Sequence, residues 1–323
     1  MPDVLHKVAV TAPAFCRSPV LREELLQVFP NAYFNDKDRY LSPSETIGFL
    51  KEADAAVIGR DRIDEEVLNH LPGLQIIAKY GVGLDNIDQA SARRHGVKIG
   101  WTAGVNKESV AELALCFMLG LCHNVFISGN LLKQNIWKKN GGRQLAGKTV
   151  GIIGCGHVGT EVLRLLSLLG STLLVCDIVD KSEVCRKYGA EIVAFDALIV
   201  QADIVSLHVP LTEQTEYMIG AAVLNRMKTS AFLINTSRGR VVDEAALKAA
   251  LMENRIAGAA LDVFNEEPPS DQELLTHPHF MGTPHIGGNT QEAVEAMGRA
   301  AIAHLKAHFG VTHKARAETQ NKP

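Results

Sequence analysis

Short hydrophobic runs alternate with amphipathic stretches along most of the chain. The runs are nearly continuous in apolar residues, as expected of strands whose two faces are both covered by helices. We predict strands at residues 7–10, 55–58, 75–79, 98–100, 149–153, 172–176, 204–207, 231–235 and 257–261. Helical patterns fall between them, for example at 21–29, 65–71, 159–168 and 243–253. This order of elements predicts βαβ units and mostly parallel sheets.

The number of strands indicates two domains. Nine strands are more than one compact sheet of this type usually holds, and 323 residues is a usual length for two domains. We place the boundary near Thr102, where the first series of strands ends and a long helical stretch, 107–138, begins. A further helical pattern covers 291–309.

Composition and charge exclude several classes of protein. The chain is 46% hydrophobic and 21% charged, and its net charge of −3 gives no basic surface for nucleic acid. The longest apolar run, 113–122, is much shorter than the roughly 20 residues that a membrane span needs. The six cysteines have irregular spacings without a C-x-x-C pair, so we expect neither a metal site nor a disulfide framework. Reduced thiols in the cytoplasm are the expected state.

A glycine motif follows the predicted strand 149–153. Gly154, Gly156 and Gly159 form G-x-G-x-x-G between that strand and an amphipathic helix. The first glycine permits a tight turn, the second lets a pyrophosphate approach the backbone, and the third allows close strand–helix packing. Asp177 ends the next strand, where a carboxylate accepts hydrogen bonds from a ribose hydroxyl and repels a 2′-phosphate. The motif predicts NAD in preference to NADP, and the alternative is a plain strand-to-helix turn.

An arginine stands where a buried strand ends. Arg238 belongs to the stretch N-T-S-R-G-R at 235–240, which follows the strand 231–235. Ligands of open α/β sheets bind at the carboxyl ends of the strands, and a guanidinium there can hold an acid substrate with two hydrogen bonds. The alternative is a surface arginine paired with a local acid such as Asp243.

Two further segments are unlike ordinary helix or strand sequence. A-L-D-V-F-N-E-E-P-P, at 260–269, places three acids before two prolines, and G-T-P-H-I-G-G, at 282–288, contains one histidine, His285. Histidine titrates near neutral pH and suits the proton transfer that accompanies hydride removal from an alcohol. A glutamate beside it would favour the imidazolium. Taken singly, His285 could also be a loop histidine without a catalytic role.

Together these motifs resemble the NAD-dependent D-isomer-specific 2-hydroxyacid dehydrogenases. The resemblance rests on N-T-S-R-G-R-V-V-D-E, A-L-D-V-F-x-E-E-P and P-H-I-G-G downstream of the glycine motif, and it runs from K-Y-G-V-G-L-D-N-I-D at 79–88 to Met297. It implies an α/β fold with two doubly wound βαβ domains. In that fold a Rossmann NAD-binding domain, here 102–289, is inserted into a discontinuous flavodoxin-like substrate domain, here 1–101 and 290–323.

The resemblance also implies roles for single residues. Arg238 matches the anchor of the substrate carboxylate and carbonyl, His285 the acid/base, and Glu267 its carboxylate partner. Backbone N–H groups of the loop that contains Val82 and Gly83 would face the substrate carboxylate, although a strand-to-helix turn that needs Gly81 and Gly83 explains the same residues. The family's cofactor contacts fall on Gly154, Gly156, His157, Val158, Gly159, Asp177, Val209, Thr236, Ser237 and Asp262. No metal is implied.

The resemblance also implies an assembly, and the sequence departs from the family at two points. Members are commonly homodimers, paired through the segment that corresponds to 105–142. The usual T-P-G-x-N reads T-A-G-V-N at 102–106, without the proline. The chain resembles a short form of the phosphoglycerate dehydrogenase branch without the regulatory domain, so feedback inhibition by serine is not expected.

We therefore expect a dehydrogenase that reversibly reduces a 2-oxo acid with NADH. A non-catalytic NAD(H)-sensing regulator of the corepressor type is the main alternative, and a G-x-G-x-x-G methyltransferase conflicts with the Arg/Glu/His series. The motifs slightly favour 3-phosphoglycerate as the substrate, with Arg60 and Arg62 as candidate phosphate ligands, over glyoxylate or hydroxypyruvate. Against the phosphate site, the arginine that the phosphoglycerate branch often has two positions before Arg60 is Ile58 here.

Overall fold

The computed structural model describes residues 6–139 and 141–311 and divides the chain into two compact units. The first unit comprises the residues up to Asn106 and those from Gln291, and the second unit is Lys107–Thr290. Residues 102–106, which the sequence analysis assigns to the second domain, belong to the first unit by their contacts. Thr102 Oγ1 lies 2.9 Å from His304 Nε2, and Val105 packs against the first unit's core. Residues 312–323 of the predicted first domain lie outside the described residues.

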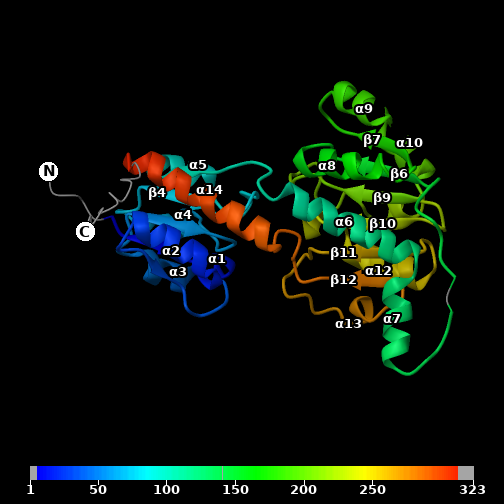
Figure 1. Cartoon of the computed structure of the whole chain (residues 1–323), viewed down its shortest axis with the longest axis horizontal. Helices are drawn as coiled ribbons and strands as arrows, with labels where there is room; N and C mark the ends of the chain where they lie inside the picture. Colours follow the sequence, from blue (N-terminus) through cyan, green and yellow to red (C-terminus); the bar gives the residue numbers. More distant parts are fainter. Residues whose placement is uncertain (1–5, 140, 312–323) are drawn as a thin grey trace, which may run out of the picture. The chain divides into compact units, whose positions relative to one another are not determined.

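The first unit is a five-stranded parallel sheet with the order β2-β1-β3-β4-β5. This is the doubly wound order of flavodoxin, so the predicted fold is confirmed. Its strands are β1 (Val8–Val10), β2 (Tyr33–Phe34), β3 (Ala55–Ile58), β4 (Ile76–Lys79) and β5 (Lys98–Gly100). Its helices are α1 (Pro13–Arg17), α2 (Pro19–Val28), α3 (Pro43–Leu50), α4 (Glu65–Asn69), α5 (Gln89–Arg94) and α14 (Gln291–Phe309) (Figure 1).

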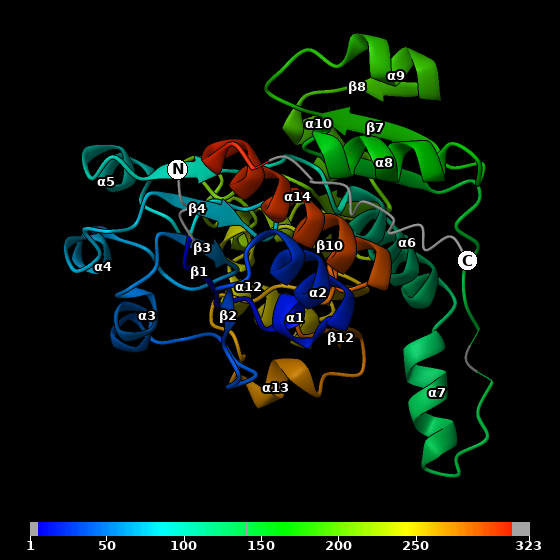
Figure 2. The same ribbon diagram turned by 60° about the vertical axis from the view of Figure 1, so that its left-hand side comes forward.

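Both ends of the chain contribute to the core of the first unit. Val8 and Val10 of β1 pack on one face of the sheet with Leu21 of α2, and with Ala301 and Leu305 of α14. Figures 1 and 2 show α14, in red and orange, running beside α2, in blue. The alternate residues of the strands point to the other face, where they meet α3 and α4. The sheet is therefore covered on both sides, as its apolar strands predict.

The second unit contains a seven-stranded parallel sheet with the order β12-β11-β10-β9-β6-β7-β8. Counted within the unit, this is the Rossmann order 3-2-1-4-5-6 with one more strand at the edge. Its strands are β6 (Thr149–Ile153), β7 (Thr172–Cys176), β8 (Ala190–Ile192), β9 (Ile204–Leu207), β10 (Phe232–Asn235), β11 (Gly258–Leu261) and β12 (Phe280–Gly282). Its helices are α6 (Lys107–Cys122), α7 (Val125–Lys133), α8 (His157–Leu166), α9 (Ser182–Tyr188), α10 (Phe195–Gln201), α11 (Ala221–Leu224), α12 (Glu244–Met252) and α13 (Gln272–Leu275), with a 3₁₀ turn at Gly239–Val241.

The prediction of one helical stretch at 107–138 is wrong in part. The stretch is broken at Asn124, whose φ of 54° is left-handed, and α7 ends at Lys133. Helix α6 buries one side against the sheet, whereas α7 has no buried residue and stands away from the sheet (Figure 2). Among the described helices none is by itself long and apolar enough to cross a membrane, and α6 with α7, bent by 69°, meets that criterion only as a pair.

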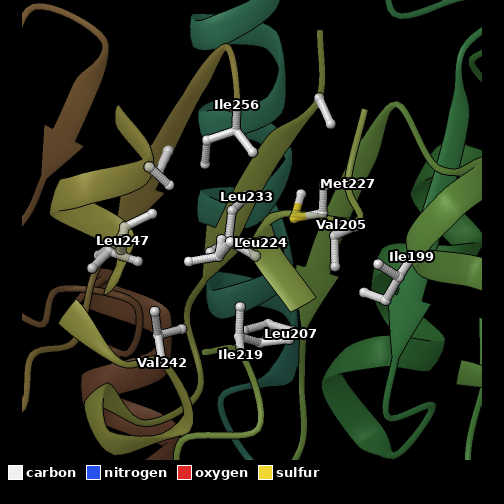
Figure 3. Packing of buried hydrophobic residues seen from close by; sticks show 14 of the residues in the cluster. Ile199, Val205, Leu207, Ile219, Leu224, Met227, Leu233, Val242, Leu247 and Ile256 are labelled. Atoms are coloured by element: carbon white, nitrogen blue, oxygen red, sulfur yellow. The ribbon is translucent and has the colours of Figure 1, made fainter. Parts of the chain in front are cut away.

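The core of the second unit holds the central strands in place. Val205 and Leu207 of β9 and Leu233 of β10 pack against Leu247 of α12 and Ile256 (Figure 3). Because these strands are rigidly packed and parallel, the segments that follow β6, β9, β10, β11 and β12 leave the sheet at one edge. Nearly all of the predicted site residues in this unit lie in those segments.

Candidate active site

The glycine motif forms a tight turn between β6 and α8. Gly154 has a φ of +88°, which favours glycine, and a Cβ on Gly159 would overlap the Gly154 carbonyl oxygen. A Cβ on Gly156 would meet open space. Gly156 is also the N-cap of α8 and gives no side-chain cap, so its side chain satisfies none of the first N–H groups of the helix, which begin with those of His157 and Val158. A helix N-terminus of this kind binds the pyrophosphate of a dinucleotide.

Asp177 lies directly beside this turn. Its Oδ2 accepts the N–H of Cys155 at 2.6 Å, and its Oδ1 accepts the N–H of Val179 at 2.8 Å. The carboxylate is thereby held at the end of β7, next to the glycine turn. Each oxygen retains a second lone pair, which fits the predicted hydrogen bonds to ribose hydroxyls.

Two further predicted cofactor contacts follow β9 and β10. The side chain of Val209 is so close to Gly154 that a Cβ there would lie 2.8 Å from Val209 Cγ1. Thr236 follows β10, and its hydroxyl is buried without a hydrogen-bond partner among the described residues. An unpartnered buried hydroxyl fits a polar group of a bound dinucleotide. Burial lowers the pKa of the neighbouring His208 to about 4, so this imidazole is neutral at physiological pH and adds no charge to the turn.

The loop with Arg238 is organised by Asn235, the last residue of β10. Asn235 Oδ1 accepts the N–H and the hydroxyl of Ser237, at 3.0 and 2.8 Å, and its Nδ2 donates to the Arg238 carbonyl at 2.8 Å. Arg238 Nη1 donates to the Ser237 carbonyl at 2.7 Å. Asp243, the predicted alternative partner of Arg238, instead accepts the N–H of Ala246 and caps α12.

Gly239 brings this loop against the acidic segment after β11. A Cβ on Gly239 would overlap the carbonyl group of Phe264, so the two backbones are in direct contact. Phe264 donates its N–H to Glu267 Oε1 at 3.1 Å. The structure therefore brings the segments of Arg238 and Glu267 together through direct backbone contact at Gly239.

Asp262 organises the loop that contains His285. It is 1% exposed. Its Oδ1 accepts the hydroxyl of Thr283 at 2.6 Å and the N–H of Ile286 at 2.7 Å, and its Oδ2 accepts the N–H of Gly287 at 2.8 Å. Burial raises the pKa of Asp262 above its usual range, although these hydrogen bonds favour the carboxylate. The family resemblance implies only a cofactor contact for Asp262, and no sequence motif points to its hydrogen bonds with this loop or to Thr283.

His285 and Glu267 form the pair that the sequence predicts. Nδ1 of His285 lies 3.1 Å from Oε1 and 3.0 Å from Oε2 of Glu267. Both side chains are partly buried, and His285 has a left-handed φ of 55°. Because Nδ1 faces the carboxylate, Nε2 is the ring nitrogen that can meet a ligand. A histidine held in this way can give or take a proton there.

The loop that follows β4 in the first unit contains Val82 and Gly83. It begins at Gly81, whose φ of +119° explains why glycine occurs there. The carbonyl of Val82 accepts a hydrogen bond from Trp101 Nε1 at 2.7 Å. At the other end of the loop, Asn86 Nδ2 donates to the Asp61 carbonyl at 2.6 Å. Across the described residues, no group of three or more histidine, cysteine or acidic side chains could hold a metal ion.

Comparison with known proteins identifies the family. Residues 115–287 match the family model of the D-isomer specific 2-hydroxyacid dehydrogenase, NAD binding domain. A glyoxylate reductase of Thermococcus litoralis is 40% identical over 79% of this chain and 80% of its own length. A D-3-phosphoglycerate dehydrogenase of Methanocaldococcus jannaschii is 34% identical over 93% of this chain, which spans only 57% of that protein. The solved D-lactate dehydrogenase of Aquifex aeolicus, in complex with NAD and lactic acid, is 26% identical, with a TM-score of 0.84 over 94% of this chain and 95% of that one.

Two doubly wound sheets, a dinucleotide turn and a histidine–glutamate pair define a nucleotide-dependent oxidoreductase. The chain belongs to the D-isomer specific 2-hydroxyacid dehydrogenase family. It is an NAD-dependent enzyme that acts on the CH–OH group of 2-hydroxy acids, and its second unit contains the NAD-binding domain.

Proposed function

We propose that this enzyme reduces a small, unphosphorylated 2-oxo acid, such as glyoxylate or hydroxypyruvate, to the D-2-hydroxy acid. The observation that carries the proposal is Ile58. Where the phosphoglycerate branch often has an arginine, Ile58 ends β3 and is fully buried in the core of the first unit. The sequence motifs slightly favour 3-phosphoglycerate. The small-acid alternative is supported by the glyoxylate reductase of Thermococcus litoralis, which is 40% identical over 79% of this chain and 80% of its own length.

The two other candidate phosphate ligands add little to a phosphate site. Arg62 Nε lies 2.7 Å from Asp64 Oδ2, and its side chain is 72% exposed. The guanidinium of Arg60 lies 5.5 Å from the centre of the Tyr40 ring, a cation–π contact. An exposed arginine paired with a neighbouring carboxylate is typical of a solvated surface and gives no support for a phosphate site.

We assign the binding of the 2-oxo acid to Arg238 and to the loop that contains Val82 and Gly83. The Arg238 guanidinium has parallel donors that suit a carboxylate and an adjacent carbonyl oxygen. It also stabilises the negative charge that develops on that oxygen during reduction. Hydrogen bonds from Asn235 fix the backbone on both sides of Ser237, which pre-organises this arginine.

We assign the proton transfer to His285. When bound, NADH supplies the hydride to C2 of the acid. The electron pair of the C=O double bond then moves to oxygen, which takes the proton from Nε2 of the imidazolium. Glu267 at Nδ1 fixes the ring orientation and stabilises the positive charge, so that the proton leaves from the correct nitrogen.

We assign the NAD site to the turn between β6 and α8 and to its neighbours. The N–H groups of His157 and Val158 would face the pyrophosphate, and Asp177 the adenosine ribose. Val209, Thr236, Ser237 and Asp262 remain the proposed contacts on the nicotinamide side. Ser237 already donates its hydroxyl to Asn235, so its contact would use the oxygen as an acceptor.

We further propose a homodimer that pairs through α6, α7 and the segment up to residue 142. Exposed apolar side chains gather there: Val125, Leu132 and Trp137 are 55%, 56% and 81% exposed. A cavity of about 260 Å³ lined by Leu121, Phe126 and Phe232, among others, lies beside them. An apolar surface of this kind is typical of an interface between subunits.

The cytoplasm remains the proposed location. All six cysteines are free thiols in the structure, and burial raises the pKa of several of them, including Cys122 and Cys155. Buried protonated thiols of this kind are inert and typical of proteins in a reducing compartment.

The substrate proposal is tested by steady-state NADH oxidation with glyoxylate, hydroxypyruvate, pyruvate and phosphohydroxypyruvate. We expect kcat/KM to be highest for one of the unphosphorylated acids and lower for phosphohydroxypyruvate than for hydroxypyruvate. The reverse order for the last pair would establish a phosphate site and return the assignment to the phosphoglycerate branch. Tight NADH binding without turnover of any acid would favour the regulator instead.

A further inference from the structure

Trp101 holds the loop that we assign to the substrate carboxylate. It directly follows β5, and its indole Nε1 donates to the Val82 carbonyl at 2.7 Å. The two residues are close because β4 and β5 are neighbours in the parallel sheet and both chains leave it at the same edge. The family motifs gave no reason to consider this residue.

The hydrogen bond from Trp101 to the Val82 carbonyl also fixes the orientation of the N–H group of Gly83. In a trans peptide the C=O of one residue and the N–H of the next lie in one plane and point in opposite directions. Trp101 therefore sets the direction of the Gly83 N–H by holding the Val82 oxygen. A hydrogen bond to the oxygen also polarises the peptide group and strengthens its N–H as a donor.

The donors of this loop are available for a ligand. Within the described residues, the backbone N–H groups of Gly81, Val82 and Gly83 donate no hydrogen bond. All three residues are half-buried at the carboxyl edge of the sheet. Successive backbone N–H groups of a turn form a concave site for an anion.

Trp101 is itself held in place on both sides. A Cβ on Gly100 would overlap the side chain of His304, and Thr102 Oγ1 lies 2.9 Å from Nε2 of the same histidine. Helix α14 thus fixes the backbone that presents the indole. Such a fixed donor can orient a peptide group in a loop, whereas a mobile one could not.

We propose that Trp101 is a positioning residue that orients the Gly83 N–H toward the substrate carboxylate. The inference rests on the proposed function for the identity of the anion. A contact with the carboxylate is equally present in the ground state and the transition state, so its loss raises KM and leaves kcat nearly unchanged.

The first test is Trp101→Phe, which keeps an aromatic ring and removes the donor. The reference protein and the Trp101→Phe variant both also contain Trp137→Phe. Trp101 is then the only tryptophan of the reference protein, and any effect of the change at Trp137 is the same in both. We expect KM for the 2-oxo acid to rise about threefold to tenfold, the usual effect of one neutral hydrogen bond. We expect kcat to stay within about twofold, and the Kd of NADH to be unchanged. An unchanged KM, or an equal loss in kcat, would overturn the proposal.

A second variant separates the hydrogen bond from the shape of the ring. In the Trp137→Phe background, Trp101 is replaced biosynthetically by benzothienylalanine, in which sulfur takes the place of the indole N–H. This isostere has nearly the shape of tryptophan. It therefore tests the hydrogen bond even if Trp101→Phe disturbs folding. The proposal requires the same rise in KM, and a KM equal to that of the tryptophan protein would assign Trp101 a purely structural function.

Calorimetric titration with oxamate distinguishes this inference from the proposed function. Oxamate has a carboxylate beside a carbonyl and is not reduced. With NADH present, we expect the loss of the indole N–H to weaken oxamate binding about threefold to tenfold. If no 2-oxo acid is reduced but oxamate binding still weakens in this way, the function fails and the inference stands. If 2-oxo acids are reduced and oxamate binds equally well to both proteins, only the inference fails.

Discussion

The backbone N–H of His285 donates to the carbonyl oxygen of Asp262 at 2.8 Å. The carboxylate of the same aspartate accepts the next two backbone N–H groups, from Ile286 and Gly287. One buried side chain therefore shapes the loop that presents the histidine, and it stabilises the left-handed backbone of His285. The proposed proton donor therefore stands on a loop held by several hydrogen bonds, which would reduce the reorganisation needed during the reaction.

Replacing His285 by alanine tests the proton transfer. Because general acid catalysis by a side chain contributes about 10²- to 10⁴-fold, we expect His285→Ala to lower kcat by that factor. The Kd of NADH, measured by fluorescence, should stay close to that of the wild type. His279→Ala, at the opposite end of β12, is the matched control and should keep its activity. Near-normal turnover of His285→Ala would exclude this residue as the acid.

Replacing Glu267 by glutamine tests the pair. Glutamine keeps the shape of the side chain but removes the negative charge 3.0 Å from His285 Nδ1. The ring then loses the charged partner that fixes its orientation, so kcat/KM should fall about tenfold while the Kd of NADH stays close to that of the wild type. Steady-state kinetics and NADH fluorescence measure the two quantities. A wild-type kcat/KM would show that the carboxylate does not act through the histidine.

Replacing Asp177 by serine tests the choice of cofactor. The carboxylate repels a 2′-phosphate and accepts ribose hydroxyls, so Asp177→Ser should narrow the preference for NADH over NADPH by at least about tenfold. The ratio of kcat/KM for the two cofactors is the measurement. Asp180→Ser removes a carboxylate from the following turn and should leave the ratio unchanged. A wild-type enzyme that uses both cofactors equally well would contradict the assignment of Asp177.

A charge on α7 tests the proposed dimer. Leu132 is 56% exposed, and Leu132→Asp should shift the protein from dimer to monomer, because an unpaired carboxylate in an apolar interface is costly. Light scattering after size-exclusion chromatography gives the mass. Leu168→Asp places the same charge on a leucine that is 75% exposed elsewhere in the second unit, and it should not change the mass. A monomeric wild type would refute the interface.

Hydrophobic runs predicted most of the fold because each central strand is buried on both faces. The strands that were not predicted are short and lie at sheet edges. Strand β2 has two half-buried residues, β8 contains an exposed glutamate, and β12 has three residues. The break between α6 and α7 was also not predicted, because Asn124 adopts a left-handed conformation and no glycine or proline signals the break. Such choices are decided by tertiary contacts, which a local pattern does not contain.

The site was predictable where chemistry and local sequence coincide. Gly154 and Gly159 of the glycine turn are required by the backbone, and Glu267 and His285 stand in segments with a distinctive composition. Thr283 and Trp101 were not predicted, since each acts on a residue from another strand end, and their partners become neighbours only when the sheet assembles. The sequence pattern therefore predicts the candidate catalytic residues but not the residues that fix the loops around them by hydrogen bonds.

The division of the chain has a consequence for synthesis on the ribosome. Lys107–Thr290 is contiguous, so all of the segments that form its sheet are available once residue 290 has been translated. The first unit is still incomplete at that point, because Ala301 and Leu305 of α14 are part of the core around β1. The earliest segment to emerge therefore waits, with apolar strands uncovered, until the last helix has been translated. Uncovered apolar strands of this kind are prone to aggregation during that interval.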